Sequence, residues 1–213
     1  MHTVAIVQVV LNLTFAKSEQ DMKLNKKTII FYIALIVITT LIKILCAPRL
    51  EFSGTTGIMA VALFAGFAGS EKKQAFLLPL ITLLVSNLII EVLFRLNMFP
   101  FAGFYKWQFI EYALLGFALT AIGMAFKKMQ TAGVFISAFV GATLFFIISN
   151  FIVWYGSSQI MGYSNDFKGL MNCYTAGLPF YRNSVLSTAI LLPVFILSYQ
   201  WYVKGRLVLS FAK

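Results

Sequence analysis

Residues 132–155 read AGVFISAFVGATLFFIISNFIVWY, and this stretch decides the class of fold. It contains no Asp, Glu, Lys or Arg. A helix of about 20 apolar residues is long enough to cross the ~30 Å hydrocarbon core of a bilayer. Apolar and polar residues do not alternate along the stretch, as they would in a strand of an outer-membrane barrel. It therefore predicts a transmembrane helix.

The whole chain has the composition of a membrane protein. Of its 213 residues, 60% are hydrophobic and 11% are charged, with a mean hydropathy of +0.87. A soluble domain carries about 25% charged residues, so this composition excludes an ordinary soluble protein. The net charge of +10 comes from basic residues at the ends of apolar segments. These basic residues are explained by the orientation of the segments in a membrane, and we expect no binding to nucleic acid.

Five further apolar segments flank this helix. With it they predict an all-α fold, a polytopic membrane helix bundle of about six transmembrane helices within residues 28–203. We expect Pro79 to lie in the first turn of the third span, where proline is tolerated, and Pro193 to kink the sixth. The six predicted spans are Thr28–Leu45, Gly54–Gly69, Ala75–Phe94, Trp107–Phe126, Ala132–Tyr155 and Ser184–Val203.

Both ends of the chain fall outside these spans. Residues 204–213 are predicted to be a cytoplasmic tail and residues 1–27 a cytoplasmic extension. The stretch MKLNKK at 22–27 resembles a bacterial start ahead of a first membrane helix. Residues 1–21 are therefore either a surface helix or an upstream mis-start.

Lys and Arg are distributed unevenly around the predicted spans, and this asymmetry predicts their orientation. Cytoplasmic segments are enriched in Lys and Arg, so the richer side is predicted to be cytoplasmic and to hold both termini, in a bacterial inner membrane. The outer loops are then Cys46–Ser53, Arg95–Lys106 and Gly156–Asn183. The eleven inner residues are Lys17, Lys23, Lys26, Lys27, Lys72, Lys73, Lys127, Lys128, Lys204, Arg206 and Lys213, and the five outer ones are Arg49, Arg95, Lys106, Lys168 and Arg182.

Polar residues inside the predicted spans gather in the halves nearest these outer loops. Asn87 and Glu91 are four residues apart and share one face of a helix, and Asn150 and Trp154 repeat this spacing on the fifth span. Glu111 lies about one turn into the fourth span. Ionisable residues inside a membrane are costly and commonly mark a functional site. Their common depth on several helices favours a water-accessible pocket that opens to the outside.

Each of these residues also has a structural explanation. The two asparagines can form hydrogen bonds between helices, and the tryptophan can belong to an interfacial belt of aromatic residues. The two glutamates can form internal ion pairs with Lys43, Arg95 or Lys106. Lys43 and Arg182 can extend to the lipid headgroups.

Small residues occur four apart on the second span, Ala62 with Gly66 and Ala65 with Gly69. This pattern allows two helices to approach closely. It serves either packing within this bundle or the docking of another membrane protein.

Motifs of several enzyme classes are missing. The sequence has no GxSxG, HExxH or Walker motif, and His2 is its only histidine, which excludes serine–histidine catalysis, zinc-peptidase chemistry and ATP hydrolysis by this chain. Cys46 and Cys173 have no metal-ligand spacing. They either form a disulfide in an oxidising periplasm or pack as small apolar side chains. We expect no enzyme activity, no catalytic residue, no metal site and no cofactor.

Three stretches resemble an uncharacterised bacterial family of integral membrane proteins regarded as transport proteins. They are FSGTTGIMAVALFAGF at 52–67, SNFIVW at 149–154 and, most specifically, GLMNCYTAGLPFYRN at 169–183. The resemblance covers the chain from about residue 48 to 200. That family is similar in turn to the S-components of energy-coupling-factor (ECF) vitamin transporters.

The resemblance implies an S-component-like bundle of six helices with cytoplasmic termini, whose outer loops close over a vitamin. It implies as partners the lipid bilayer, a small solute, and a membrane coupling subunit with ATPases or another membrane complex. The docking motif A-x-x-x-A of S-components is absent from the first span, where the residue four positions after Ala34 is Ile38.

The sequence thus predicts a substrate-binding transport subunit that captures a small, vitamin-like solute from the non-cytoplasmic side. The main alternative is a structural or assembly subunit of a larger inner-membrane complex, and a less favoured one is an enzyme acting on a lipid. The predicted substrate-binding residues are Asn87, Glu91, Glu111, Asn150, Trp154, Tyr174, Arg182 and Asn183, and the predicted partner-docking residues are Ala62, Ala65, Gly66 and Gly69.

Overall fold

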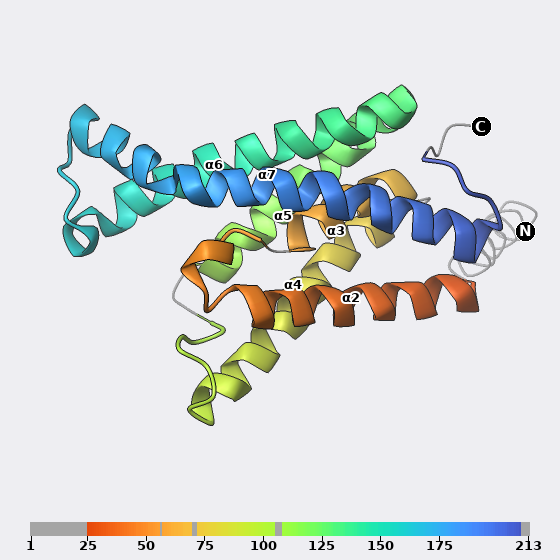
Figure 1. The fold of residues 1–213 in the computed structure, drawn as a ribbon, viewed down its shortest axis with the longest axis horizontal. Coiled ribbons are helices and arrows are strands. Elements are labelled where there is room, and N and C mark those ends of the chain that lie inside the picture. The colour runs from red at the N-terminus through yellow and green to blue at the C-terminus, as the bar shows by residue number, and fades with distance from the viewer. Residues whose placement is uncertain (1–24, 56, 70–71, 105–107, 210–213) are drawn as a thin grey trace, which may run out of the picture.

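The computed structural model describes residues 25–55, 57–69, 72–104 and 108–209, and this part of the chain is all-helical, with no strand. Short 3₁₀ turns lie at Leu50–Phe52 (η1) and Lys127–Met129 (η2). The predicted all-α class is therefore confirmed (Figure 1). The helices are α2 (Lys26–Cys46), α3 (Gly57–Ala68), α4 (Lys72–Arg95), α5 (Gln108–Phe126), α6 (Gln130–Met161) and α7 (Phe167–Lys204).

Four helical segments of the described chain are long and apolar enough to cross a membrane, judged by length and composition, and they indicate a membrane protein. One of them covers most of α5 and α6, which are joined by η2. With 12 residues, α3 is shorter, about 18 Å long. A helix thus lies at the position of each predicted span. The four segments are Lys26–Cys46, Lys73–Arg95, Phe109–Gly156 and Phe167–Lys204.

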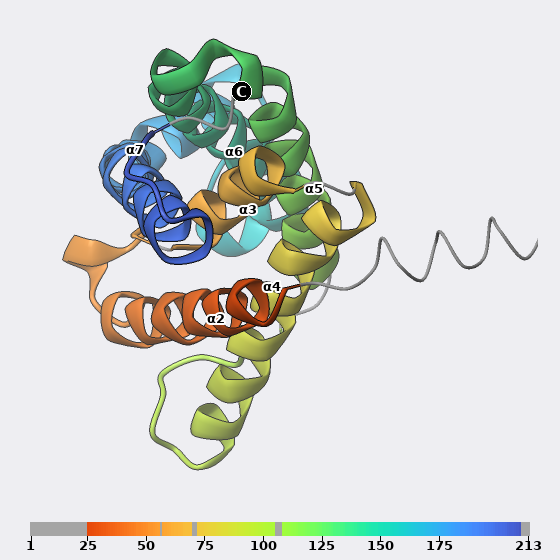
Figure 2. The same ribbon diagram turned by 90° about the vertical axis from the view of Figure 1, so that its right-hand side faces the viewer.

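The short helix α3 lies in the middle of the bundle, with the other helices around it (Figure 2). Every residue from Met59 to Phe67 is buried. A helix that is apolar on all sides has to be covered by its neighbours, and α4, α5 and α7 supply most of the cover. Phe64 packs against Phe31 of α2 and Tyr199 of α7, with ring centroids 5.7 Å and 5.4 Å apart. The core of the bundle is therefore built around α3.

The small residues of α3 are used for packing inside the bundle. A side chain added at Gly66 would lie 2.7 Å from the backbone nitrogen of Met124 on α5. Ala62 and Ala65 are buried in the same core, and Gly69 is half-buried just after the helix. Of the two explanations for this face, the structure favours packing within the bundle, because little of it is exposed to a docking partner.

Gly66→Ala is expected to destabilise the fold. The added methyl group has to displace the backbone of α5, and overpacking of this kind costs about 1–3 kcal/mol. The melting temperature of the purified protein in detergent should fall. Gly156→Ala is the matched control, because the methyl group that it adds meets no described atom within 4 Å beyond the adjoining residues of its own helix. Equal melting temperatures for the two variants would contradict the close contact of α3 with α5.

The predicted outer loop Gly156–Asn183 is wrong. Helix α6 continues to Met161 and α7 begins at Phe167, so only a short turn connects them. The carboxylate of Asp166 caps α7 by accepting a hydrogen bond from the backbone N–H of Gly169 at 2.7 Å. With 38 residues, α7 is about 57 Å long, which exceeds the ~45 Å of a bilayer with its headgroups. The polar residues that favoured a loop thus lie on helices that project beyond the other elements (Figure 1).

Prolines lie deeper inside the helices than the apolar pattern predicts. Pro79 is the eighth residue of α4, since this helix begins at Lys72, ahead of the apolar run. Its predicted place in the first turn is therefore wrong. Pro193 lies within α7 as expected, and α7 also contains Pro179.

The two ends of the bundle differ in what they carry. The connection from α2 to α3, the loop 96–104 and the turn between α6 and α7 lie at one end, which we call the loop end (Figure 1). The first turn of α2 and the last turn of α7 lie at the other end. The predicted extension 1–27 falls mostly outside the described residues, as do the last four residues of the predicted tail 204–213.

Candidate functional site

Two adjacent cavities lie near the loop end of the bundle. The first, of about 330 Å³, is lined by α2, α4, α5 and the loop 96–104, and we call it the Lys43 cavity. The second, of about 360 Å³, is lined by α5, α6 and α7, and we call it the Glu111 cavity. Both fall in the size range of small-molecule sites. They share a wall of four residues, Ser53, Gly54, Tyr112 and Phe145.

Lys43 and Asn87 provide the polar chemistry of the Lys43 cavity. The ammonium group of Lys43, on the last turns of α2, donates a hydrogen bond to Oδ1 of Asn87 on α4, with a separation of 2.5 Å. Asn87 is buried, with 5% of its surface exposed. An ammonium group has three N–H donors, and within the described residues only this neutral amide accepts from it. A positive charge without a carboxylate partner therefore faces the first cavity.

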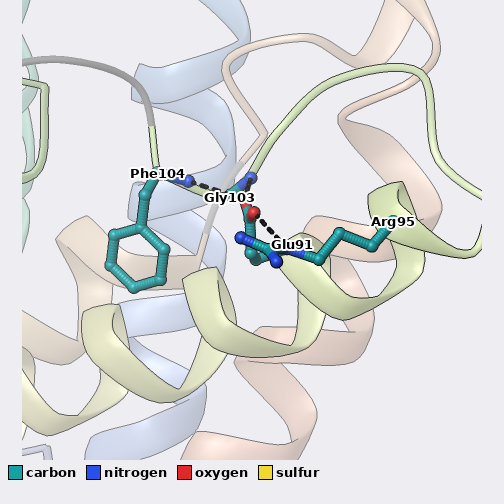
Figure 3. A network of polar contacts seen from close by, with 4 residues as sticks. All are labelled: Glu91, Arg95, Gly103 and Phe104. Atoms are coloured by element: carbon teal, nitrogen blue, oxygen red, sulfur yellow. Dashed lines mark hydrogen bonds and ion pairs between the residues drawn. The ribbon is translucent and has the colours of Figure 1, made fainter.

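Glu91 fastens the loop 96–104 to α4. Its carboxylate accepts hydrogen bonds from the backbone N–H groups of Gly103 at 3.1 Å and Phe104 at 3.5 Å, and it pairs with Arg95 at 2.8 Å (Figure 3). Arg95 is one of the predicted partners of Glu91, but both residues lie on α4 and the Arg95 side chain is exposed, so this pair does not join two helices. Glu91 lines neither cavity, yet the loop that it holds forms part of the Lys43 cavity. Glu91 thus positions a wall of the site.

Glu91→Ala is expected to release this loop. The substitution removes the only side-chain acceptor for the amides of Gly103 and Phe104 within the described residues, and amides freed in this way exchange faster with solvent. Hydrogen exchange of these two amides should accelerate severalfold. Glu51→Ala changes an exposed glutamate at the loop end and should leave their exchange unchanged. Unaltered protection in Glu91→Ala would show that the loop is held by other contacts.

Glu111 and Asn150 provide the polar chemistry of the Glu111 cavity. Within the described residues the Glu111 carboxylate, in the first turn of α5, has no hydrogen-bond or ion-pair partner; Lys106, one of its predicted partners, lies outside them. Asn150 donates to the backbone oxygen of Phe146 at 2.9 Å, which leaves its Oδ1 beside Gly177 of α7. No Lys, Arg or His of the described chain lines this cavity. This cavity therefore presents acceptors and a negative charge.

The structure distributes the remaining predicted site residues around the cavities. Trp154 donates to the backbone oxygen of Ser164 at 3.0 Å, and Tyr174 donates to that of Ile147 at 2.9 Å. Asn183 donates to the backbone oxygens of Glu51 and Ser53 at 2.8 and 2.9 Å. Arg182 is exposed. Of the eight predicted binding residues, three line the cavities, namely Asn87, Glu111 and Asn150.

Most residues that line the cavities are absent from the predicted binding set, Lys43 and Tyr112 among them. Lys43 carries a recognisable signal, a charge inside an apolar span, but its nearness to the span end also fits a headgroup contact. Tyr112 carries no such signal, because a tyrosine in the first turns of a span is typical of the membrane interface. Only the packing of α5 against its neighbours places it between the two cavities.

The turn before α7 is stabilised by Asp166. Hydrogen bonds from Ser164 Oγ at 2.6 Å and from the backbone of Gly169 hold the pKa of the Asp166 carboxyl below its usual range. Its contribution to stability is fully present above the ordinary pKa of Asp and is lost as the pH falls through the depressed value. Tyr163, three residues before Asp166, lines the Glu111 cavity.

Neither a metal centre nor a disulfide is found in the described residues. No group of three or more His, Cys, Asp or Glu side chains within them is placed to hold a metal ion. Cys46 and Cys173 are both free thiols. The thiol of Cys173 donates to the backbone oxygen of Asn150 at 3.5 Å, so it packs against α6 as a small buried residue.

Comparison with known proteins places the chain in a family. A family model described as "Family of unknown function (DUF6580)" matches residues 23–208. No curated protein matches the chain, and no solved structure does. The family match covers all six helices α2 to α7 and both cavities. The chain therefore belongs to the DUF6580 family, whose function is unknown.

Proposed function

We propose that this chain is a membrane transport protein that binds a small, vitamin-like solute in the two cavities, in the manner of an ECF S-component. The observation that carries this proposal is the convergence of polar residues from different helices on two adjoining cavities. Lys43, Asn87, Glu111 and Asn150 come from α2, α4, α5 and α6. Ionisable residues at membrane depth are retained chiefly where they serve a function.

Six crossings of the membrane account for the arrangement of the helices. The chain reverses between α5 and α6 at η2, where Gln130 has a φ of 53°, and α5 alone is about 28 Å long. The described chain begins and ends at the same end of the bundle, as an even number of crossings requires. The excess of Lys and Arg, eleven against five, supports a cytoplasmic location for that end. The loop end then faces the outside.

Solute capture then takes place from the non-cytoplasmic side. The connection between α2 and α3 and the loop 96–104 both contribute to the Lys43 cavity, and both lie at the loop end. Movement of such loops, or rocking of the bundle, admits and releases the solute. A coupling subunit with ATPases is the partner that the likeness to S-components implies. The runner-up function, an assembly subunit, has less support because the small residues of α3 are buried within the chain.

Depletion of solutes from the medium tests transport without knowing the substrate. Cells that express the wild-type protein should remove one or a few small compounds from a complex medium, measured by untargeted mass spectrometry. Asn87→Leu removes the acceptor for Lys43 and should reduce this depletion at least about tenfold. Asn172→Leu changes an exposed asparagine of α7 and should behave as wild type. Equal depletion by the wild type and Asn87→Leu would contradict the proposal.

A further inference from the structure

We propose that the two cavities together select a dipolar ligand, a small molecule with an anionic group at Lys43 and a cationic amino group at Glu111. The inference rests on the proposed function, since it names the chemical class of the solute. It follows from the charges that line each cavity, from the wall between them and from the aromatic residues of the second.

Each cavity carries a single sign of charge. Among the described residues, Lys43 is the only cationic one that lines the first cavity, and no described Asp or Glu lines it. In the same part of the chain, Glu111 is the only anionic residue that lines the second cavity, and no described Lys, Arg or His lines it. A ligand carboxylate or phosphate would accept from the free N–H groups of Lys43. A ligand ammonium would donate to Glu111 and to the Oδ1 of Asn150.

The two charges do not neutralise each other. Lys43 and Glu111 form no ion pair with each other, and the described residues contain only the pair between Glu91 and Arg95. Burial of a charge away from water without a partner of opposite sign is unfavourable. A ligand with one charge would provide such a partner for only one of the two residues. A dipolar ligand satisfies both and adds no net charge to the site. The bundle is therefore complementary to a molecule that extends from one cavity into the other, past the residues that line both.

Aromatic residues line the places where the apolar spacer and the ammonium group of such a ligand would lie. Tyr112 and Phe145 belong to the wall between the cavities and are placed to contact an apolar spacer between the two charged groups. Phe146 and Tyr181 line the Glu111 cavity, and their ring centroids lie 4.8 Å apart. Aromatic faces attract ammonium groups. They reinforce the preference of the second cavity for a cation.

Matched sets of compounds test this inference on the purified full-length protein in detergent. Each set has one spacer in three forms, which carry both charges, the acid alone or the amine alone. One set is 4-(aminomethyl)benzoate, 4-methylbenzoate and 4-methylbenzylamine, and the others are straight-chain ω-amino acids with the matching alkanoates and alkylamines. For at least one spacer the dipolar form should raise the melting temperature, with an affinity about tenfold or more above both single-charge forms.

Two variants should lose the preference for the dipolar form over one of the single-charge forms if the assignment of charges is right. Lys43→Met should bind the amine and the dipolar form with equal affinity. Glu111→Gln should bind the acid and the dipolar form with equal affinity. Lys168→Met, an exposed lysine of α7, should keep the wild-type preference. The inference is overturned if single-charge forms bind as well as dipolar ones in the wild type, or if both variants keep the preference.

The identity of a solute retained by the wild-type protein separates this inference from the proposed function. A retained solute with both an acidic and a basic group supports both. A retained solute that lacks either group overturns the dipolar inference and leaves the transport proposal standing. Failure of the wild-type protein to retain any solute or to bind any compound of the matched sets overturns both.

Discussion

Lys43→Met is expected to weaken solute binding strongly while the protein remains folded. Lys43 is the only cation among the described residues that line its cavity, and the loss of one partner from a desolvated charged contact weakens binding by about 2–5 kcal/mol. Methionine preserves most of the aliphatic volume, and the replacement of a poorly paired charge by an apolar group is commonly neutral or stabilising. The melting temperature should therefore hold or rise while the affinity falls about 30-fold or more.

Lys73→Met is the matched control for this variant. Lys73 is exposed on the first turn of α4, far along that helix from Asn87 at the cavity. Binding is measured by the amount of solute that the purified proteins retain. Retention by Lys73→Met should equal that of the wild type. Wild-type retention by Lys43→Met would show that the ammonium group does not contact the solute.

Gly103→Ala is expected to open the Lys43 cavity and lower stability together. A Cβ atom at Gly103 would collide with the backbone oxygen of Asn87 and lie 2.7 Å from the backbone nitrogen of Glu91. Both atoms belong to α4 and cannot yield without distorting that helix, so the loop 96–104 has to move. The bonds from this loop to Glu91 would be lost with it. We expect a cost of about 1–3 kcal/mol and severalfold faster hydrogen exchange at Phe104.

Gly156→Ala again serves as the control, because its added methyl group meets no described atom within 4 Å beyond the adjoining residues of its own helix. Hydrogen exchange and retained solute should both be measured on the two variants. The loss of loop protection together with loss of solute in Gly103→Ala would identify the loop as a wall of the binding site. Normal protection and normal retention would contradict the close approach of this loop to α4.

The fold was predictable from the sequence wherever the composition of one continuous segment determines its structure. An uninterrupted apolar run such as residues 132–155 has to form its own hydrogen bonds in lipid, so its helical structure follows from composition. The same reasoning fails for residues 156–183. They carry Gly, Pro and polar side chains, which are typical of loops, although most of them lie on α6 and α7. Asp166 with Gly169 was the available signal, since Asp is a preferred helix N-cap.

The candidate site was predictable in part. The depth of Asn87, Glu111 and Asn150 in their spans indicated a shared location, and these three residues line the cavities. The same depth did not separate them from Glu91, whose carboxylate is used by Arg95 and the loop 96–104. Spacing along one helix gives the face and depth of a residue. Which loop packs against that face depends on tertiary contacts between segments far apart in the sequence.

Native mass spectrometry of the purified wild-type protein is the most direct test of solute binding at these cavities. The protein should be extracted in mild detergent, incubated with concentrated growth medium and freed from unbound compounds. We expect a population that carries one small molecule, released on activation, and no such population for Lys43→Met under the same conditions. Wild-type protein that is folded and uniformly free of any small molecule would contradict the account.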